Sequence, residues 1–229
     1  MQQIKVIAFD ADDTLWVNEP YFRDAEKQFC KLFAHLMPEK ELTELLFKTE
    51  IENLEKYGYG AKGFTLSLLE TALYITDKKV DAEIIHQIIQ LGKDLIDKPV
   101  ELLDDIEYVL THFKNNYRII LATKGDLLDQ QRKLKKSGLS HLFHHIEVMH
   151  DKTETEYLKL IHRLDITPRE FLMVGNSIKS DIIPVIALGG KAVHIPYHIT
   201  WAHETVHTPH LTDFYTISKM KELIDIVNL

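Results

Sequence analysis

The sequence has very little cysteine and no long apolar run. Cys30 is the only cysteine among 229 residues, so an intrachain disulfide is impossible, and its helix-like, apolar neighbourhood indicates a buried structural thiol. No apolar run approaches the roughly 20 residues that a membrane-spanning helix needs. An apolar run that starts at Ile4 leaves no room for a signal peptide. We therefore expect a cytoplasmic protein that has no membrane partner.

Positive charge is also in short supply. The chain has 27 Lys and Arg residues against 35 Asp and Glu residues, which gives a formal net charge of −8. This balance argues against nucleic acid or an anionic membrane as the main partner, because both favour basic surfaces. A small anionic substrate remains compatible if a metal ion and a few lysines supply positive charge locally. The hydrophobic content of 45% is ordinary for a folded soluble protein.

A cluster of carboxylates follows the first apolar run. Residues 4–9 are rich in branched and aromatic side chains and hardly alternate, which is typical of a strand covered on both faces in a parallel sheet. Asp10, Asp12 and Asp13 come directly after it, at the edge where such sheets bind ligands. A helix cap by Asp12 or Asp13 would use only one carboxylate, and a calcium loop would need Gly where Leu15 stands. Acids crowded in this way require a cation or a basic side chain nearby.

Residues from about 19 to 97 contain no convincing strand. Amphipathic stretches predict helices over residues 21–36, 39–57, 64–75 and 81–96. Pro38, a glycine-rich run at residues 58–63 and a turn at residues 77–79 separate them. We expect these helices to form a compact bundle.

After Pro99, helices alternate with short apolar strands. The predicted helices cover residues 102–114, 127–136, 153–164, 178–188 and 217–227, and the predicted strands cover 117–122, 145–148, 171–174 and 191–195. This alternation predicts an α/β fold with a doubly wound parallel sheet. Because the first strand precedes the helical block, the block is an insertion. We expect an α/β core of residues 1–17 and 98–229 and an all-helical cap of residues 18–97.

Each later strand is followed by a polar group suited to binding phosphate. Thr123 and Lys124 precede a glycine, where a hydroxyl and backbone N–H groups could hold a phosphoryl oxygen, although Thr123 could simply cap the next helix. Lys152 opens a helix, a position that usually prefers an acid, so it could contact an anion. Asp181 follows the strand at residues 171–174 and could complete a hard-cation site, or it could be a cap. Together with the acids after the first strand, these make four matches in a fixed order, which are hard to explain by accident.

In this order of motifs the chain resembles the haloacid dehalogenase-like superfamily. That superfamily's signature is Asp-x-Asp-x-Thr, then Thr or Ser, then Lys, then Gly-Asp-x-x-x-x-Asp. Its elements stand here as Asp10 to Thr14, Thr123, Lys152, and Gly175-Asn176 to Asp181. The match spans nearly the whole chain, and the inserted helices resemble the superfamily's helical cap. The resemblance implies a Rossmann-like core.

The resemblance also implies roles for individual residues. Asp10 would be the nucleophile that forms an aspartyl phosphate, and Asp12 would be the general acid and base. Thr123 and Lys152 would bind the phosphoryl oxygens, with Lys124 beside them. Mg²⁺ would be the cofactor, held by Asp10, Asp12 through its backbone carbonyl, and Asp181. The expected activity is hydrolysis of small phosphomonoesters.

Two positions distinguish branches of the superfamily. Asn176 stands where the family often has Asp, so we expect it to be a secondary metal ligand that brings one negative charge less. Asp12 argues against the dehalogenase branch, which lacks a carboxylate there and needs no metal. A phosphomutase would keep the same motifs, and a catalytically silent phosphate-binding relative is a further alternative. Either a monomer or a homodimer is compatible with the sequence.

Weaker signals lie in the helical block and near the C-terminus. Tyr59 and Lys62 lie in the glycine-rich run, which in similar proteins faces the catalytic edge and helps to select substrates, although a plain turn is an equal alternative. Five histidines crowd into residues 194–210, namely His194, His198, His203, His207 and His210. Their spacing matches no recognised zinc pattern, so we expect an irregular crossing with exposed or hydrogen-bonded histidines.

Overall fold

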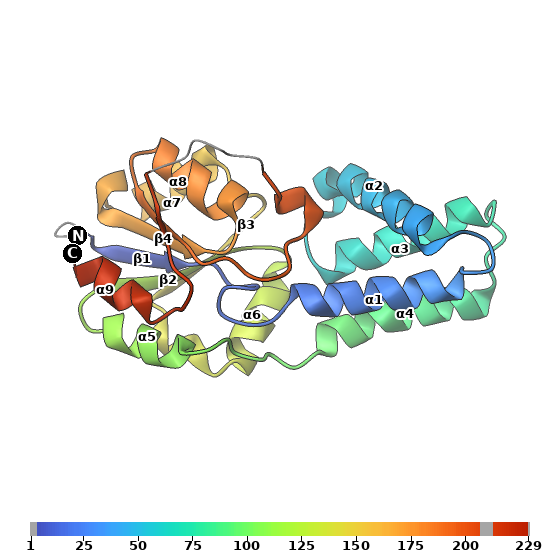
Figure 1. Cartoon of the computed structure of the whole chain (residues 1–229), viewed down its shortest axis with the longest axis horizontal. Coiled ribbons are helices and arrows are strands. Elements are labelled where there is room, and N and C mark those ends of the chain that lie inside the picture. Colours follow the sequence, from blue (N-terminus) through green and yellow to red (C-terminus); the bar gives the residue numbers. More distant parts are fainter. Residues whose placement is uncertain (1–3, 207–212, 229) are drawn as a thin grey trace. The chain divides into compact units, whose positions relative to one another are not determined.

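The structure is a computed structural model that describes residues 4–206 and 213–228. The chain divides into two compact units. Figure 1 shows both, with colours that follow the sequence from the N-terminus to the C-terminus. One unit consists of Met1–Glu19, Val100–Lys124 and Gln130–Leu229, and it holds the sheet. The other consists of Pro20–Pro99 with Gly125–Asp129, and it is helical. The predicted fold class, a doubly wound α/β core with an inserted helical block, is confirmed.

A parallel sheet of six strands, counted over the described ranges, forms the first unit. The strands are β1 (Val6–Phe9), β2 (Arg118–Lys124), β3 (His145–Met149), β4 (Phe171–Gly175), β5 (Lys191–His194) and β6 (Tyr215–Thr216). Their spatial order is β3-β2-β1-β4-β5-β6, and every neighbouring pair is parallel. The strand order reverses between β1 and β4, which is where ligands bind in open α/β sheets.

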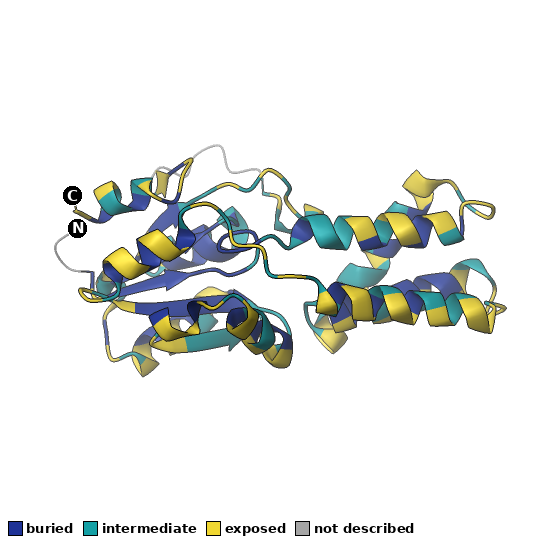
Figure 2. Cartoon of the chain, turned by 90° about the horizontal axis from the view of Figure 1, so that it is seen from below, coloured by how far each residue is buried: buried dark blue, intermediate teal, exposed yellow. Residues whose placement is uncertain are grey.

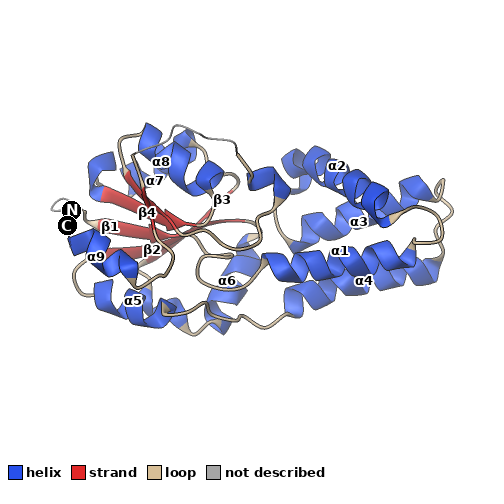
Figure 3. Ribbon diagram, viewed as in Figure 1, coloured by secondary structure: helices blue, strands red, loops and turns tan. Residues whose placement is uncertain are grey.

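Helices cover both faces of this sheet, as the unbroken apolar strand predicted (Figure 3). Val6 and Ala8 pack on one face with α7 (Glu154–Arg163) and α8 (Ile183–Ala187). Ile7 and Phe9 pack on the other face with α5 (Ile106–Phe113) and α9 (Glu222–Asn228). All four side chains of β1 are fully buried, and Figure 2 shows buried strands between helices that are exposed on their outer sides.

Four helices with their own apolar core make up the second unit. They are α1 (Glu19–Leu32), α2 (Glu39–Tyr57), α3 (Ala61–Ile75) and α4 (Ala82–Asp97). The core includes Phe29, Leu46, Leu68 and Ile88, and Cys30 is buried among these apolar side chains as predicted. Within the described ranges, no helix is both long and apolar enough to cross a membrane.

Two predicted helices near the core start later than expected. The helix predicted from residue 102 begins at Ile106, because the chain before it pairs with the first loop. Leu103 donates its backbone N–H to Leu15 (2.9 Å), and Leu102 forms a β-bridge with Trp16. The helix predicted from residue 217 begins at Glu222, after the short strand β6 that the sequence did not predict.

The helix predicted over residues 178–188 is divided in two. Ile178–Ile182 form a π-helical turn, and α8 follows from Ile183. Pro184 explains the break, because it has no N–H to donate to the carbonyl of Ser180. The hydroxyl of Tyr157 donates to that carbonyl instead (3.1 Å). Helix α6 (Leu127–Lys136) and the short 3₁₀ turns Leu139–Leu142, Pro168–Glu170 and Ala202–Glu204 complete the described elements.

Candidate active site

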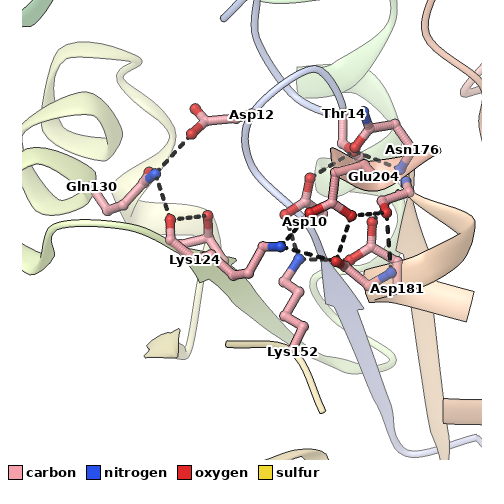
Figure 4. A network of polar contacts seen from close by, with 12 residues as sticks. Asp10, Asp12, Thr14, Lys124, Gln130, Lys152, Asn176, Asp181 and Glu204 are labelled. Carbon is pink, nitrogen blue, oxygen red and sulfur yellow. Dashed lines mark hydrogen bonds and ion pairs between the residues drawn. The ribbon is translucent and has the colours of Figure 1, made fainter. Parts of the chain in front are cut away.

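The predicted site residues of the core lie at the carboxyl edge of the sheet. Asp10 follows β1, Thr123 and Lys124 end β2, Lys152 follows β3, and Asn176 follows β4. Since these strands are parallel and adjacent, their ends meet at one edge. Figure 4 shows the polar network that most of these side chains form there.

Lys152 lies between two carboxylates. Its Nζ atom is 2.5 Å from Asp10 Oδ1 and 2.6 Å from Asp181 Oδ1, and all three side chains are almost fully buried. Burial alone would lower the pKa of Lys152, but the charges of Asp10 and Asp181 raise it well above its ordinary value. Burial raises the pKa of Asp10 to about 7, against the opposing charge of Lys152 and with the added repulsion of Asp181. The three groups therefore act as one coupled cluster with more negative than positive charge.

Asp181 is held in place by the loop before it. Its Oδ2 atom accepts a hydrogen bond from the backbone N–H of Ser177 (3.0 Å). Gly175 allows this approach, because a Cβ atom at that position would lie 2.2 Å from Asp181 Oδ2. The glycine of the last motif is thus required by the close packing of a carboxylate against the backbone.

Thr14 connects the first motif to the last. Its hydroxyl lies 3.1 Å from Asp10 Oδ2 and 3.3 Å from Asn176 Oδ1, and it accepts the backbone N–H of Asn176 (3.1 Å). One carboxylate oxygen and one amide oxygen are therefore held within reach of the same atom. The backbone carbonyl oxygen of Asn176 also lies 3.1 Å from His194 Nε2.

Asp12 has partners that the sequence did not predict. Its Oδ1 atom accepts hydrogen bonds from Trp16 Nε1 (2.8 Å) and from Lys133 Nζ (2.9 Å). Its Oδ2 atom accepts one from Gln130 Nε2 (2.8 Å). Figure 4 shows this carboxylate turned toward Gln130, away from the cluster around Lys152. The second aspartate of the motif is thus held by α6.

Asp13 caps a helix, which was one of the two readings that the sequence left open for it. Its carboxylate accepts the backbone N–H groups of Asn18 (2.9 Å) and Glu19 (3.0 Å), where α1 begins. Asp13 has a φ of 59°, a left-handed conformation that Asp tolerates better than most residues. Burial raises the pKa of its carboxyl to about 8, although the two N–H donors oppose this shift.

Thr123 and Lys124 have different surroundings. The hydroxyl of the buried Thr123 donates to the backbone carbonyl of Lys124 (3.2 Å). The Lys124 ammonium forms an ion pair with Glu204 and donates to Ser180 Oγ (2.9 Å). It also lies 3.8 Å from Asp151, the neighbour of Lys152. Lys124, which the sequence predicted to contact phosphate, is thus already paired with a carboxylate.

Glu204 is the main site residue that sequence reasoning missed. It lies in the 3₁₀ turn Ala202–Glu204, within the stretch that was expected to be an irregular crossing. Its carboxylate accepts from the hydroxyls of Ser177 and Ser180, the latter at 2.6 Å. Burial would raise the pKa of Glu204, but Lys124 and the two hydroxyls lower it to about 2. No motif or spacing in the sequence marks this position.

The histidine-rich stretch contributes contacts around this edge. His203 Nε2 lies 3.0 Å from Lys179 Nζ, whose ammonium also donates to the His203 carbonyl (2.9 Å). The His198 ring lies against that of Tyr197. His207 and His210 lie outside the described residues.

No group of three or more His, Cys, Asp or Glu side chains is placed to hold a metal ion in residues 4–206 and 213–228. The predicted magnesium ligands are of a different composition. They comprise only two such side chains, Asp10 and Asp181, together with the Asn176 amide and the backbone carbonyl of Asp12.

The two predicted cap residues belong to the helical unit. Lys62 lies in the first turn of α3, and its ammonium forms an ion pair with Asp126 (3.0 Å). This pair, together with two backbone N–H donors, lowers the pKa of Asp126 despite partial burial. Tyr59 lies in the turn between α2 and α3 and is partly buried.

Comparisons with known proteins agree with the motifs. The model of the haloacid dehalogenase-like hydrolases matches residues 4–189. The chain is similar to the solved haloacid dehalogenase-like family hydrolase of Xanthomonas campestris, at 33% identity over 99% of this chain and 91% of that one, with a TM-score of 0.89. It is 25% identical to glyceraldehyde 3-phosphate phosphatase of Methanopyrus kandleri, over 98% of this chain and 97% of that protein. It is 22% identical to N-acylneuraminate-9-phosphatase of Mus musculus, over 97% and 93%. With its four motifs gathered at one sheet edge and a family match over most of its length, the chain belongs to the haloacid dehalogenase-like hydrolases.

Proposed function

We propose that this protein is a Mg²⁺-dependent phosphatase that hydrolyses small phosphomonoesters through an aspartyl-phosphate intermediate. The observation that carries the proposal is the contact of the buried Lys152 ammonium with both Asp10 and Asp181. A buried lysine that joins the first and last motifs provides a fixed positive charge where a phosphoryl group would meet the nucleophile. The two phosphatases to which the chain is similar support the same reaction class.

The reaction takes place in two displacements. A carboxylate oxygen of Asp10 forms a bond to phosphorus while the bond from phosphorus to the ester oxygen breaks, and Asp12 gives its proton to the leaving alcohol. Water then attacks the phosphorus of the aspartyl phosphate while Asp12 takes a proton from that water. The bond from phosphorus to the Asp10 oxygen breaks, which restores the Asp10 carboxylate and releases inorganic phosphate. Because Asp12 is bound by Lys133 and Gln130, its side chain must turn away from α6 to reach the leaving group.

Lys152 and Thr123 support the displacement at phosphorus. Asp10 must be ionised to attack, and the adjacent Lys152 opposes the burial that raises its pKa. The same ammonium can donate to a phosphoryl oxygen as negative charge spreads in the transition state. Thr123, at the end of the neighbouring strand, would supply a hydroxyl and backbone donors for a second oxygen.

The residues present fit Mg²⁺ as the cofactor. Asp10, Asp181, Asn176 and the Asp12 carbonyl would provide oxygen donors, which are the ligands that this cation prefers. The Asp10 and Asn176 oxygens already share the Thr14 hydroxyl as a neighbour. When bound, the ion would reduce the repulsion between an anionic nucleophile and an anionic substrate. The excess negative charge around Lys152 is consistent with this requirement.

The substrate is proposed as a class only. The names of the two relatives denote phosphatases of small phosphorylated compounds, and this chain covers nearly the full length of each. Tyr59 and Lys62 of the helical unit are the residues that we propose to select the leaving group. The cytoplasmic location and the monomer or homodimer stay predictions.

A panel of phosphate esters tests the proposal directly. Release of inorganic phosphate is measured with Mg²⁺ and with a chelator, for the wild type, for Asp10→Asn and for the control Asp105→Asn, which changes an aspartate paired with Lys221. We expect Mg²⁺-dependent release that the Asp10 substitution abolishes and the Asp105 substitution leaves intact. Activity that survives both the chelator and Asp10→Asn would refute the mechanism. Phosphoryl transfer between two positions of a substrate without phosphate release would indicate a mutase.

A further inference from the structure

Glu204 pairs with a lysine that would otherwise strengthen the positive charge at the phosphate-binding edge. The Lys124 ammonium follows Thr123 directly in the chain and lies close to both Ser180 and Asp151, the neighbours of Asp181 and Lys152. An ammonium at this position would attract a phosphoryl group. It is instead in contact with the Glu204 carboxylate, and both side chains are about one-eighth exposed, at 14% and 12%.

Several contacts hold the Glu204 carboxylate in this position. Its second oxygen accepts from the hydroxyls of Ser177 and Ser180, at the start of and within the π-helical turn that carries Asp181. Figure 4 shows Glu204 in the same polar network as Asp181. The turn that carries it is fixed by Lys179, which donates to the carbonyl of His203 (2.9 Å). Such a fully bonded carboxylate carries its negative charge at neutral pH.

This arrangement is unfavourable for binding an anion. A carboxylate near a phosphate site repels the anionic substrate, and this repulsion is stronger in a partly buried site than in bulk water. A group that served only to join loops could be neutral, since Ser177 and Ser180 donate equally well to an amide oxygen. The charge itself therefore needs an explanation other than packing.

We propose that Glu204 is a positioning residue that neutralises Lys124 and thereby limits the affinity of the site for inorganic phosphate. This inference rests on the proposed phosphatase function. If the Lys124 charge were not neutralised, the edge would hold the dianionic product more tightly, and product release would slow turnover. With Lys124 paired to Glu204, its charge adds little to phosphate binding, and phosphate can leave.

The test measures phosphate binding, not only turnover. Inorganic phosphate is titrated calorimetrically into the wild type and Glu204→Gln in the presence of MgCl₂, and phosphate is also tested as a competitive inhibitor. Removing the charge of Glu204 should tighten the phosphate Kd by about tenfold, or about 1.4 kcal/mol. A merely structural role predicts the opposite, because a loosened loop would bind phosphate more weakly.

Three further variants identify the cause. Glu204→Asp keeps the charge and should bind phosphate within about twofold of the wild type. The double variant Glu204→Gln with Lys124→Met removes both charges, and its phosphate Kd should return to within about twofold of the wild-type value. Glu170→Gln is the matched control, because Glu170 also has a pKa lowered to about 2 by a lysine, Lys5, yet lies at the start of β4, at the opposite edge of the sheet. It should leave phosphate binding unchanged.

The outcomes separate this inference from the proposed function. Unchanged or weaker phosphate binding by Glu204→Gln would overturn the role of Glu204, and so would tighter binding that persists in the double variant. If Glu204→Gln does not fold, the test uses Glu204→Asp, which keeps the charge. Wild-type phosphate affinity in this variant would support the role of the charge, and a tenfold tightening would contradict it. A wild type that hydrolyses phosphate esters but fails these tests overturns the inference alone. A wild type that neither hydrolyses them nor binds phosphate overturns both proposals.

Discussion

Lys152 Nζ lies 2.5 Å from Asp10 Oδ1, in a position where both groups are buried. Replacing Lys152 by Met leaves the carboxylates of Asp10 and Asp181 without their shared cation. We expect kcat to fall by about 10²- to 10³-fold, because a fixed donor to the transition state is lost and Asp10 is harder to ionise. The unfolding free energy should fall by roughly 3–5 kcal/mol, because breaking a buried ion pair leaves uncompensated charge.

Steady-state kinetics and urea unfolding measure the two effects. The matched control is Lys159→Met, since Lys159 lies on α7, pairs with Glu156 and is more than half exposed. It should change stability by at most about 1 kcal/mol and leave kcat unaltered. Equal losses in the two lysine variants would contradict the special role of Lys152.

Gly175 is predicted to be required for the position of Asp181. In Gly175→Ala the new methyl group would lie 2.2 Å from Asp181 Oδ2, so the carboxylate or the backbone must move. We expect kcat/KM to fall by about 10²-fold, since a misplacement of about 1 Å in an active site can have that effect. The Mg²⁺ concentration for half-maximal activity should rise. Gly138→Ala is the control, because a Cβ atom there would meet nothing within 4 Å, although the residue has a φ of +76°. It should lower stability but keep activity.

The sequence was sufficient to predict strands β1 to β5 and the polar groups at the ends of β1 to β4, but not the short strand β6. Unbroken apolar runs made β1 and β4 recognisable, and parallel strands must bring Asp10, Lys152 and Asp181 to one edge. This part follows from local patterns and from topology. The division of the predicted helix at Pro184 could also have been anticipated, since proline removes a backbone donor.

The partners of the site residues could not be predicted in the same way. Gln130 and Lys133 bind Asp12 from a helix whose polar residues look like an ordinary solvated face. Glu204 reaches Lys124 from a stretch without regular periodicity. Such contacts depend on how loops and helix faces meet in space, and a single sequence has no period or spacing that encodes them.

Asp13 is predicted to act as a helix cap and not in the reaction. Asp13→Asn keeps a side-chain acceptor for the N–H groups of Asn18 and Glu19, and Asn tolerates a φ of 59°. It should therefore retain wild-type kcat and stability. Asp13→Ala loses the cap and places an alanine, which has no polar side chain, in the left-handed region. Its free energy of unfolding, measured in urea, should fall by about 1–2 kcal/mol. A large loss of kcat in a stable Asp13→Asn variant would assign this aspartate a chemical role.

Glu204 should make stability depend on pH in the acidic range. Its pKa is about 2 in the folded protein and 4.5 as the ordinary value, so between these limits the unfolded chain binds the proton more readily. The stabilisation is fully present above pH 4.5 and is lost as the pH falls toward 2. At pH 7 it amounts to at most roughly 3 kcal/mol. Denaturant unfolding of the wild type and Glu204→Gln should therefore differ most near neutral pH, and the two curves should converge on acidification. A difference in unfolding free energy that stays constant from pH 7 to pH 3 would show that the Lys124 pair contributes nothing through its charge.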